Sequence, residues 1–189
     1  VPGQELAFHQ ALELAIEYAE ALNVPNVNIL AGKQPQDADL LPCLNTLANN
    51  LKLACHLLSN RDIQPVFEMI NGTDMPRFLV QNIAQGQEML EAVQHPALKM
   101  QFDCYHMAMM DENVLAALQE NIDWIGHIQF ADCPGRHEPD TAQIDYSAIF
   151  SWLKQSVYTG FIAAEYKPQS HSNQSFAWKE KYFSNNHSY

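Results

Sequence analysis

The chain has little positive charge and no long apolar run. Of its 189 residues, 10 are Lys or Arg and 22 are Asp or Glu, which gives a formal net charge of −12 at pH 7. Because an acidic chain repels a phosphate backbone, we expect no nucleic-acid partner. No apolar stretch reaches the ~18 residues that a bilayer span needs, and no secretion signal opens the sequence. We therefore expect no membrane partner.

Cysteine is also scarce, and no two cysteines form a CxxC pair. The four that occur are Cys43, Cys55, Cys104 and Cys133. A chain of this length can bury a core large enough to fold without disulfide bonds, and it fits one domain. We therefore expect free thiols and a cytoplasmic protein.

What the sequence does contain is an alternation of two hydrophobic periods. Helical spacing predicts helices over residues 5–22, 40–58, 77–93, 113–121 and 146–155. Short apolar runs between them predict strands over 27–30, 64–68, 98–103, 124–129 and 161–165. This order predicts an α/β fold with a parallel sheet covered by helices. The periodicity leaves open whether the sheet is doubly wound or part of a (β/α)₈ barrel.

Four of the predicted strands end in an oxygen-bearing side chain. These residues are Glu68, Asp103, Gln129 and Glu165, and they are 35, 26 and 36 residues apart (103 − 68, 129 − 103 and 165 − 129). Each interval matches one βα repeat, so the four side chains would meet at the mouth of a barrel, where barrel enzymes build their active sites. Converging carboxylates need a neutralising cation, and oxygen ligands suit Mg²⁺ or Mn²⁺. The alternative for any one of them is a helix cap.

Histidines stand close to two of these strand ends. His106 follows Asp103 in the predicted loop, where it could orient a substrate or support the metal, although a surface histidine is the alternative. His127 shares a strand face with Gln129 and would lie one layer deeper in a barrel. For His127 we expect a hydrogen-bonded core position.

Two cations follow the last two predicted strands. Arg136, in the polar loop 132–140, offers a fork that matches a substrate carboxylate. Lys167 lies two residues after Glu165 and could hold an anion. A solvated turn and an exposed lysine are the alternatives.

Together these segments resemble a known family. The resemblance rests on Val66-Phe67-Glu68, Phe102-Asp103-x-x-His106, His127-x-Gln129, Arg136-His137-Glu138-Pro139-Asp140 and Glu165-Tyr166-Lys167-Pro168. They resemble the hydroxypyruvate isomerase family of the xylose-isomerase-like barrels, from about residue 5 to 168. The resemblance implies a metal set of Glu68, Asp103, Gln129 and Glu165, with Glu68 and Glu165 as the catalytic acid/base pair. It also implies that His106, Arg136, His137 and Lys167 bind a small hydroxy- or oxo-acid.

The resemblance also predicts a domain layout and a reaction. Residues 1–168 would supply strands four to eight of a TIM barrel, and 169–189 a divergent tail. The open sheet edge makes a homo-oligomer a further expectation. The reaction would interconvert hydroxypyruvate and tartronate semialdehyde (2-hydroxy-3-oxopropanoate) by metal-assisted proton transfer through an enediolate. The alternatives are a 2-oxo-tetronate isomerase, a ketose epimerase and a catalytically silent fragment. A zinc phosphodiesterase on the same barrel is less favoured, because it would use several His ligands and basic contacts.

Overall fold

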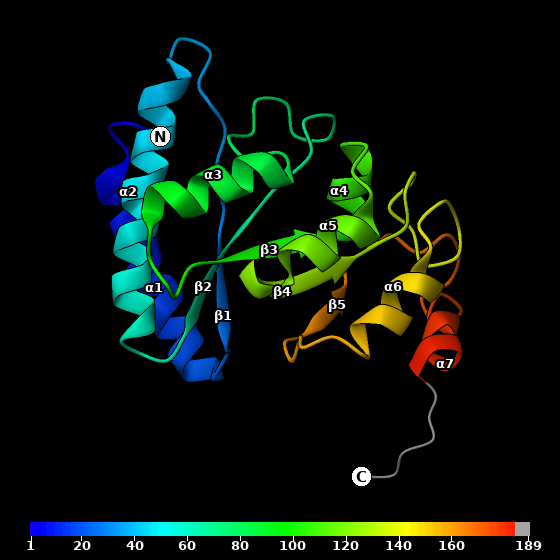
Figure 1. The fold of residues 1–189 in the computed structure, drawn as a ribbon. Coiled ribbons are helices and arrows are strands. Elements are labelled where there is room, and N and C mark those ends of the chain that lie inside the picture. The colour runs from blue at the N-terminus through cyan, green and yellow to red at the C-terminus, as the bar shows by residue number, and fades with distance from the viewer. Residues whose placement is uncertain (184–189) are drawn as a thin grey trace.

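The computed structural model describes residues 1–183, in which five strands form one sheet between helices (Figure 1). The strands are β1 (Asn26–Ile29), β2 (Gln64–Glu68), β3 (Lys99–Asp103), β4 (Ile125–Phe130) and β5 (Ile162–Ala164). The helices are α1 (Glu5–Leu22), α2 (Leu40–Ser59), α3 (Ile83–Val93), α4 (Cys104–Met109), α5 (Val114–Asn121), α6 (Tyr146–Leu153) and α7 (Ala177–Phe183), with a 3₁₀ turn at Ile122–Trp124.

The strand order settles the choice between a doubly wound sheet and a barrel. All neighbouring strands are parallel, and they lie side by side in chain order, β1 to β5. A doubly wound sheet reverses its strand order at a switch point, whereas barrel strands follow each other around the axis. The described sheet curls as part of a barrel, with helices along its outer side (Figure 1). The expected partial TIM barrel is confirmed.

The hydrophobic core lies between the sheet and these helices. Phe67, Phe102 and Ile128, one from each central strand, are completely buried, as is Leu51 of α2. Burying a side chain of this size stabilises the fold by roughly 1.5–3 kcal/mol. Side chains of a strand alternate between its two faces. Because these three strand residues point into the core, the polar residue that follows each of them points to the opposite face of the sheet.

Two elements differ from the sequence-based expectation. Helix α3 begins at Ile83 rather than near residue 77, because the Asn82 side chain caps it by accepting a hydrogen bond from the Gln85 N–H at 3.0 Å. Arg77 instead adopts a left-handed backbone conformation with φ of 64°. The unpredicted helix α4 follows β3 directly, since the Asp103 carboxylate accepts a hydrogen bond from the Tyr105 N–H.

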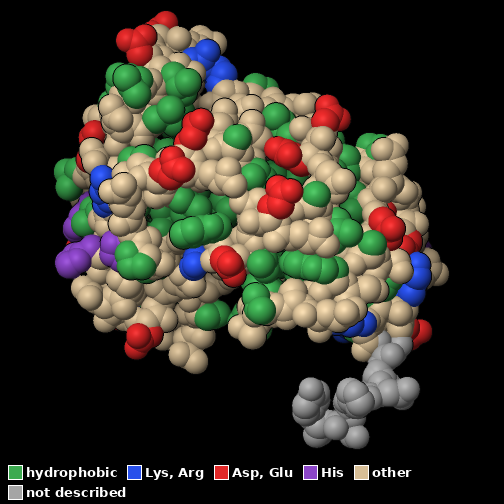
Figure 2. Space-filling view, in the orientation of Figure 1, with side chains coloured by type: hydrophobic (Ala, Val, Ile, Leu, Met, Phe, Trp, Pro, Cys, Tyr) green, Lys and Arg blue, Asp and Glu red, His purple; other side chains and the backbone are tan. Residues whose placement is uncertain are grey.

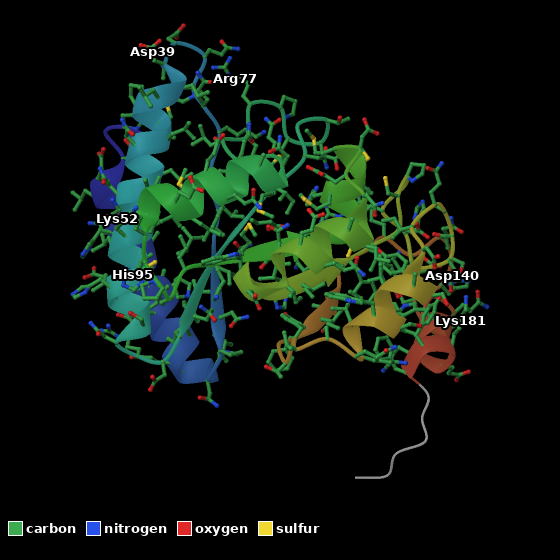
Figure 3. All side chains as sticks on the ribbon, viewed as in Figure 1. Asp39, Lys52, Arg77, His95, Asp140 and Lys181 are labelled. Atoms are coloured by element: carbon green, nitrogen blue, oxygen red, sulfur yellow. The ribbon has the colours of Figure 1, made fainter. Side chains whose placement is uncertain are left out.

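The segment after Pro168 packs on the barrel as far as it is described. Trp178 of α7 lies edge-on to Phe130, with ring centroids 5.1 Å apart, and Tyr182 contacts Phe150. Figure 3 places Lys181 beside Asp140, and Lys181 Nζ lies 2.9 Å from Asp140 Oδ2. Helix α7 therefore braces the loop after β4. Residues 184–189 of the expected tail lie outside the described part.

The surface reflects the composition. Figure 2 shows acidic side chains spread over one face, with only scattered Lys and Arg and no continuous basic patch on that face. In residues 1–183, no helix combines the length and the apolar character that crossing a bilayer requires.

Candidate functional site

One cavity at the carboxyl ends of the strands gathers most of the sequence-predicted residues. It has a volume of about 570 Å³. Its lining includes Glu68, His106, Arg136, Glu165 and Lys167, together with Leu30, Ile70, Asp74, Met75, Tyr105 and Gly135. Residues from β2 to the segment after β5 thus meet in one place, as the βα spacing predicted.

Two buried carboxylates lie close together at this site, and one of them, Glu68, lines the cavity. Glu68 is 5% exposed, and Asp103 is fully buried. Burial, together with the nearby Asp103 carboxylate, raises the pKa of Glu68 to about 7. Burial also raises the pKa of Asp103 to about 6, against the opposing effect of Arg136. Both carboxyl groups therefore gain a proton more readily than in water.

Glu68 is held from the neighbouring strand. Asn28 Nδ2 on β1 donates a hydrogen bond to Glu68 Oε2 at 2.8 Å. This leaves Glu68 Oε1 for the cavity, where it lies 4.0 Å from His106 Nε2.

His106 lies on helix α4 and is buried, so the expectation of a loop residue is wrong. Its helix exists because Asp103 both ends β3 and caps α4. Burial, together with the Arg136 guanidinium, lowers the pKa of His106 to about 4, so the ring is neutral at neutral pH. Its contacts with Asp103 Oδ2 at 3.7 Å and with Glu68 are therefore not ion pairs.

Arg136 bridges the two sides of the cavity. Its Nη2 lies 2.9 Å from Glu165 Oε1 and 3.6 Å from Asp103 Oδ2. The guanidinium also lies over the Tyr105 ring, 5.1 Å from its centroid. The Glu165 side chain is 51% exposed, unlike that of Glu68. The two glutamates of the site therefore differ strongly in their access to water.

A buried aspartate organises the loop that carries Arg136. Asp132 is fully buried, and its carboxylate accepts hydrogen bonds from the backbone N–H groups of residues 133, 141, 142 and 144 at 2.8–3.0 Å. The Arg136 N–H donates to the Asp132 carbonyl at 3.0 Å, and Arg136 has a left-handed φ of 57°. This conformation turns the loop back over the cavity.

Two predicted residues, Gln129 and His137, lie beside the cavity and form hydrogen bonds with other protein groups. Gln129 lies one residue before the end of β4, and its Oε1 accepts a hydrogen bond from Gln101 Nε2 at 2.6 Å. His137 Nδ1 donates to the Lys167 carbonyl at 2.6 Å, which ties the Arg136 loop to the segment after β5. Neither residue lines this cavity in the described part of the chain.

The core role expected for His127 is only half right. His127 Nδ1 is buried, but it has no hydrogen-bond partner in residues 1–183. Its side chain shares a second, smaller hollow with Asn28 and Gln101, below the strand ends. Burial in this polar but unbonded position lowers its pKa.

The sequence analysis missed a polar network beside His106. Asn71 is fully buried and contacts both His106 and Asp74, and Tyr105 Oη donates to Asp74 Oδ2 at 2.8 Å. The signal that could have revealed it is Asn71-x-x-Asp74 directly after a strand, since Asn often bonds to the backbone two or three residues on. Asn28 gave no such signal, because its partner lies on another strand.

The donor set fits a divalent cation. Ligand atoms of Glu68, Asp103 and His106 all lie within 4.8 Å of one another. Asp103 Oδ2 is buried and has no hydrogen-bond partner in residues 1–183. A buried carboxylate oxygen without a partner is costly, and a bound cation would remove that cost. Oxygen donors dominate the set, which suits a hard ion such as Mg²⁺ or Mn²⁺.

Comparison with known proteins identifies the fold family. The xylose isomerase-like TIM barrel family matches residues 2–182. The chain belongs to the xylose isomerase-like TIM barrel family. It is 35% identical to the hydroxypyruvate isomerase of Escherichia coli and 34% identical to the 2-oxo-tetronate isomerase of Cupriavidus necator. Each alignment covers 96% of this chain and 70% of the relative.

A solved structure of this xylose isomerase-like family agrees with the described fold. The crystal structure of an AP endonuclease of family 2 from Brucella melitensis matches with a TM-score of 0.92 and 27% identity. The match covers 96% of this chain and 70% of that one. The sequence relatives are named isomerases, which supports an enzyme of the isomerase type.

Proposed function

We propose that this chain catalyses the isomerisation of hydroxypyruvate and tartronate semialdehyde by metal-assisted proton transfer. The observation that carries the proposal is the meeting of Glu68, Arg136 and Glu165 in one cavity, with the buried Asp103 carboxylate 3.6 Å from Arg136. The E. coli relative named hydroxypyruvate isomerase supports the choice of substrate.

The proposed metal site uses Glu68, Asp103, Gln129 and Glu165, with Mg²⁺ or Mn²⁺. Asp103 Oδ2, which has no hydrogen-bond partner in residues 1–183, and the raised pKa values of Glu68 and Asp103 support a cation at this point. When bound, such an ion polarises carbonyl and hydroxyl oxygens and makes the neighbouring C–H more acidic. Gln129 would have to release its hydrogen bond from Gln101 to take part.

The two glutamates transfer the proton. Glu165, exposed to the cavity, removes the proton from the hydroxymethyl carbon of hydroxypyruvate, which leaves an enediolate. The hydroxyl proton of the same carbon passes to the former carbonyl oxygen, and proton exchange with water resets the two carboxyl groups after product release. Glu68, which is buried and shielded from water, delivers a proton to the adjacent carbon. Two carboxyl groups whose surroundings differ this strongly in access to water are typical of acid/base pairs.

The basic side chains of the site bind the substrate carboxylate. Arg136 uses one nitrogen for Glu165 and keeps further N–H donors of its planar fork for a carboxylate. Lys167 lines the same cavity and adds positive charge. His137 contributes by fixing the Lys167 backbone through its Nδ1.

An isomerase assay tests the proposal. We expect turnover of hydroxypyruvate by the purified chain with Mg²⁺ or Mn²⁺, and loss of turnover on chelation. Glu165→Gln should lower kcat by about a hundredfold or more, since general acid–base groups contribute that much. Glu120→Gln, which removes the same charge from an exposed position on α5, is the matched control. A folded, metal-loaded chain without turnover would instead favour a catalytically silent protein.

A second candidate is the isomerisation of a 2-oxo-tetronate. The cavity of about 570 Å³ leaves room for one more carbon, and the C. necator relative carries that name. Comparing kcat/KM for three-carbon and four-carbon acids separates the two. The acidic surface and the carboxylate-rich donor set argue against a phosphodiesterase that acts on nucleic acid.

We also propose that residues 1–168 correspond to strands four to eight of an eight-stranded barrel, followed by the tail 169–189. The described sheet leaves the outer edges of β1 and β5 without a paired strand, and the isomerase relatives are longer than this chain. Helix α1 supports the same layout, because it exposes an apolar stripe that further helices or a second copy could cover. This stripe consists of Leu6, Leu14, Tyr18 and Leu22. The four cysteines are free and buried, which fits the cytoplasmic location that we propose.

A further inference from the structure

The orientation of the Asn71 side chain is fixed by its own backbone neighbours. Asn71 Oδ1 accepts hydrogen bonds from the N–H groups of Thr73 at 3.1 Å and Asp74 at 2.8 Å. Since a backbone N–H can only donate, the atom that faces it must be the amide oxygen. Asn71 Nδ2 therefore points the other way, toward Asp74 Oδ2 at 3.0 Å and His106 Nδ1 at 2.7 Å.

This orientation decides where the proton of the His106 ring lies. An amide NH₂ group has hydrogens to donate and no lone pair to accept with, so His106 Nδ1 must be the acceptor in this contact. In the neutral ring the proton then belongs to Nε2. That N–H faces Asp103 Oδ2 at 3.7 Å and Glu68 Oε1 at 4.0 Å, which is too far for direct hydrogen bonds. A substrate oxygen can therefore receive it.

A metal-binding histidine would show the opposite pattern. It needs a lone pair on the nitrogen that faces the ion, and its other ring nitrogen carries a hydrogen that it donates to a carboxylate or carbonyl. Here the partner behind His106 is itself a donor, although the ring lies within ligand distance of Glu68 and Asp103. Proximity alone would place His106 among the ligands, but the hydrogen bonds do not.

We propose that Asn71 is a positioning residue that keeps His106 protonated on Nε2. The ring thereby serves as a neutral N–H donor to the substrate oxygen and not as a metal ligand. This inference rests on the proposed function for its catalytic part, while the position of the ring proton stands independently of it.

The test combines ¹⁵N NMR of the histidine rings with steady-state kinetics. The His106 signals are assigned by their loss in His106→Gln. In the wild-type chain we expect a protonated Nε2 and an unprotonated Nδ1. In Asn71→Asp, one carboxylate oxygen can still accept the hydrogen bonds from the backbone N–H groups of Thr73 and Asp74. The other oxygen can only accept, so His106 Nδ1 must donate to it. The ring proton should therefore move to Nδ1, and kcat should fall about a hundredfold or more with little change in KM.

Two further variants separate this effect from damage to the fold. Asn71→Asp combined with Asp74→Asn removes the repulsion between the two carboxylates and should show the same move of the ring proton. Asn113→Asp introduces the same charge at an exposed helix cap, where its oxygen keeps the bond from the Ala116 N–H, and should leave both readouts unchanged.

Four outcomes would each contradict the assignment of the ring proton, the donor role of His106 or the proposed function. A wild-type ring protonated on Nδ1 would overturn the assignment, as would an unmoved proton in both Asn71→Asp chains. A moved proton with unchanged kcat would overturn the donor role. Normal ring signals in a wild-type chain that does not isomerise hydroxypyruvate would overturn the proposed function and leave the assignment of the proton standing.

Discussion

Glu68 should destabilise the metal-free protein at neutral pH, and Glu68→Gln should reverse this. Burial and the Asp103 carboxylate raise the pKa of Glu68 from 4.5 to about 7. The folded chain therefore keeps a proton on Glu68 between these pH values, while the unfolded chain has already lost it. Stability falls as pH rises through this window, because the folded state binds more protons. The rise in pKa corresponds to about 3 kcal/mol lost by pH 8.

Replacement by Gln keeps the shape and removes the titration. The new side chain can still accept the hydrogen bond from Asn28 Nδ2, and its NH₂ group can face Asp103. At pH 4.5 the two proteins should unfold at nearly the same urea concentration in the presence of a chelator. At pH 8 the variant should be more stable by about 3 kcal/mol, while its turnover is lost. A pH dependence below 6 remains in the variant, because the pKa of Asp103 is also raised.

Metal binding should make the wild type more stable than Glu68→Gln, the reverse of their order without metal. A ligand that binds only the folded state stabilises it by about 2.7 kcal/mol at a hundred times its Kd, and the variant lacks one proposed ligand. Glu120→Gln is the matched control, since it removes the same charge from an exposed position on α5 that has no part in the proposed metal site. The reasoning is refuted if the metal-free wild type gains stability from pH 5 to 8, or if Glu68→Gln leaves its stability at pH 8 unchanged.

Three further changes test other parts of the molecule. Arg136→Lys should raise KM for hydroxypyruvate about tenfold, because a lysine cannot hold a carboxylate with two parallel hydrogen bonds; an unchanged KM would remove Arg136 from substrate binding. Asp132→Ala should cost about 3 kcal/mol or more in urea unfolding, because it leaves four backbone N–H groups without their acceptor, and a smaller loss would contradict its place as the organiser of the loop. Leu14→Gln with Leu22→Gln should reduce self-association in sedimentation experiments if the exposed stripe of α1 is a contact surface, and unchanged association would point to the sheet edges instead.

The sequence was sufficient to predict the alternation of elements and the strand ends, because both depend on local hydrophobic period. The predicted strand 64–68 and the helix 5–22 match β2 and α1. Helix α4 escaped prediction, since Asp103 serves as both strand end and helix cap and no loop separates the two. The start of α3 was placed too early, because the residues before Asn82 continue an apolar pattern that belongs to a loop packed on the core.

The contacts that give each site residue its chemistry join different βα repeats, and no local pattern contains them. Glu68 and Glu165 follow similar apolar strands and look equivalent in the sequence. In the fold, Glu68 is bonded to Asn28, 40 residues earlier, and excluded from water, whereas Glu165 is half exposed and pairs with Arg136. Because burial raises the pKa of Glu68 in the metal-free protein, Glu68 is suited to hold a proton for delivery. The division of roles between the two glutamates therefore follows from burial. Asn28→Ala removes a hydrogen bond that lowers the pKa of Glu68, so this variant should raise that pKa further in the metal-free protein while leaving proton removal by Glu165 in place.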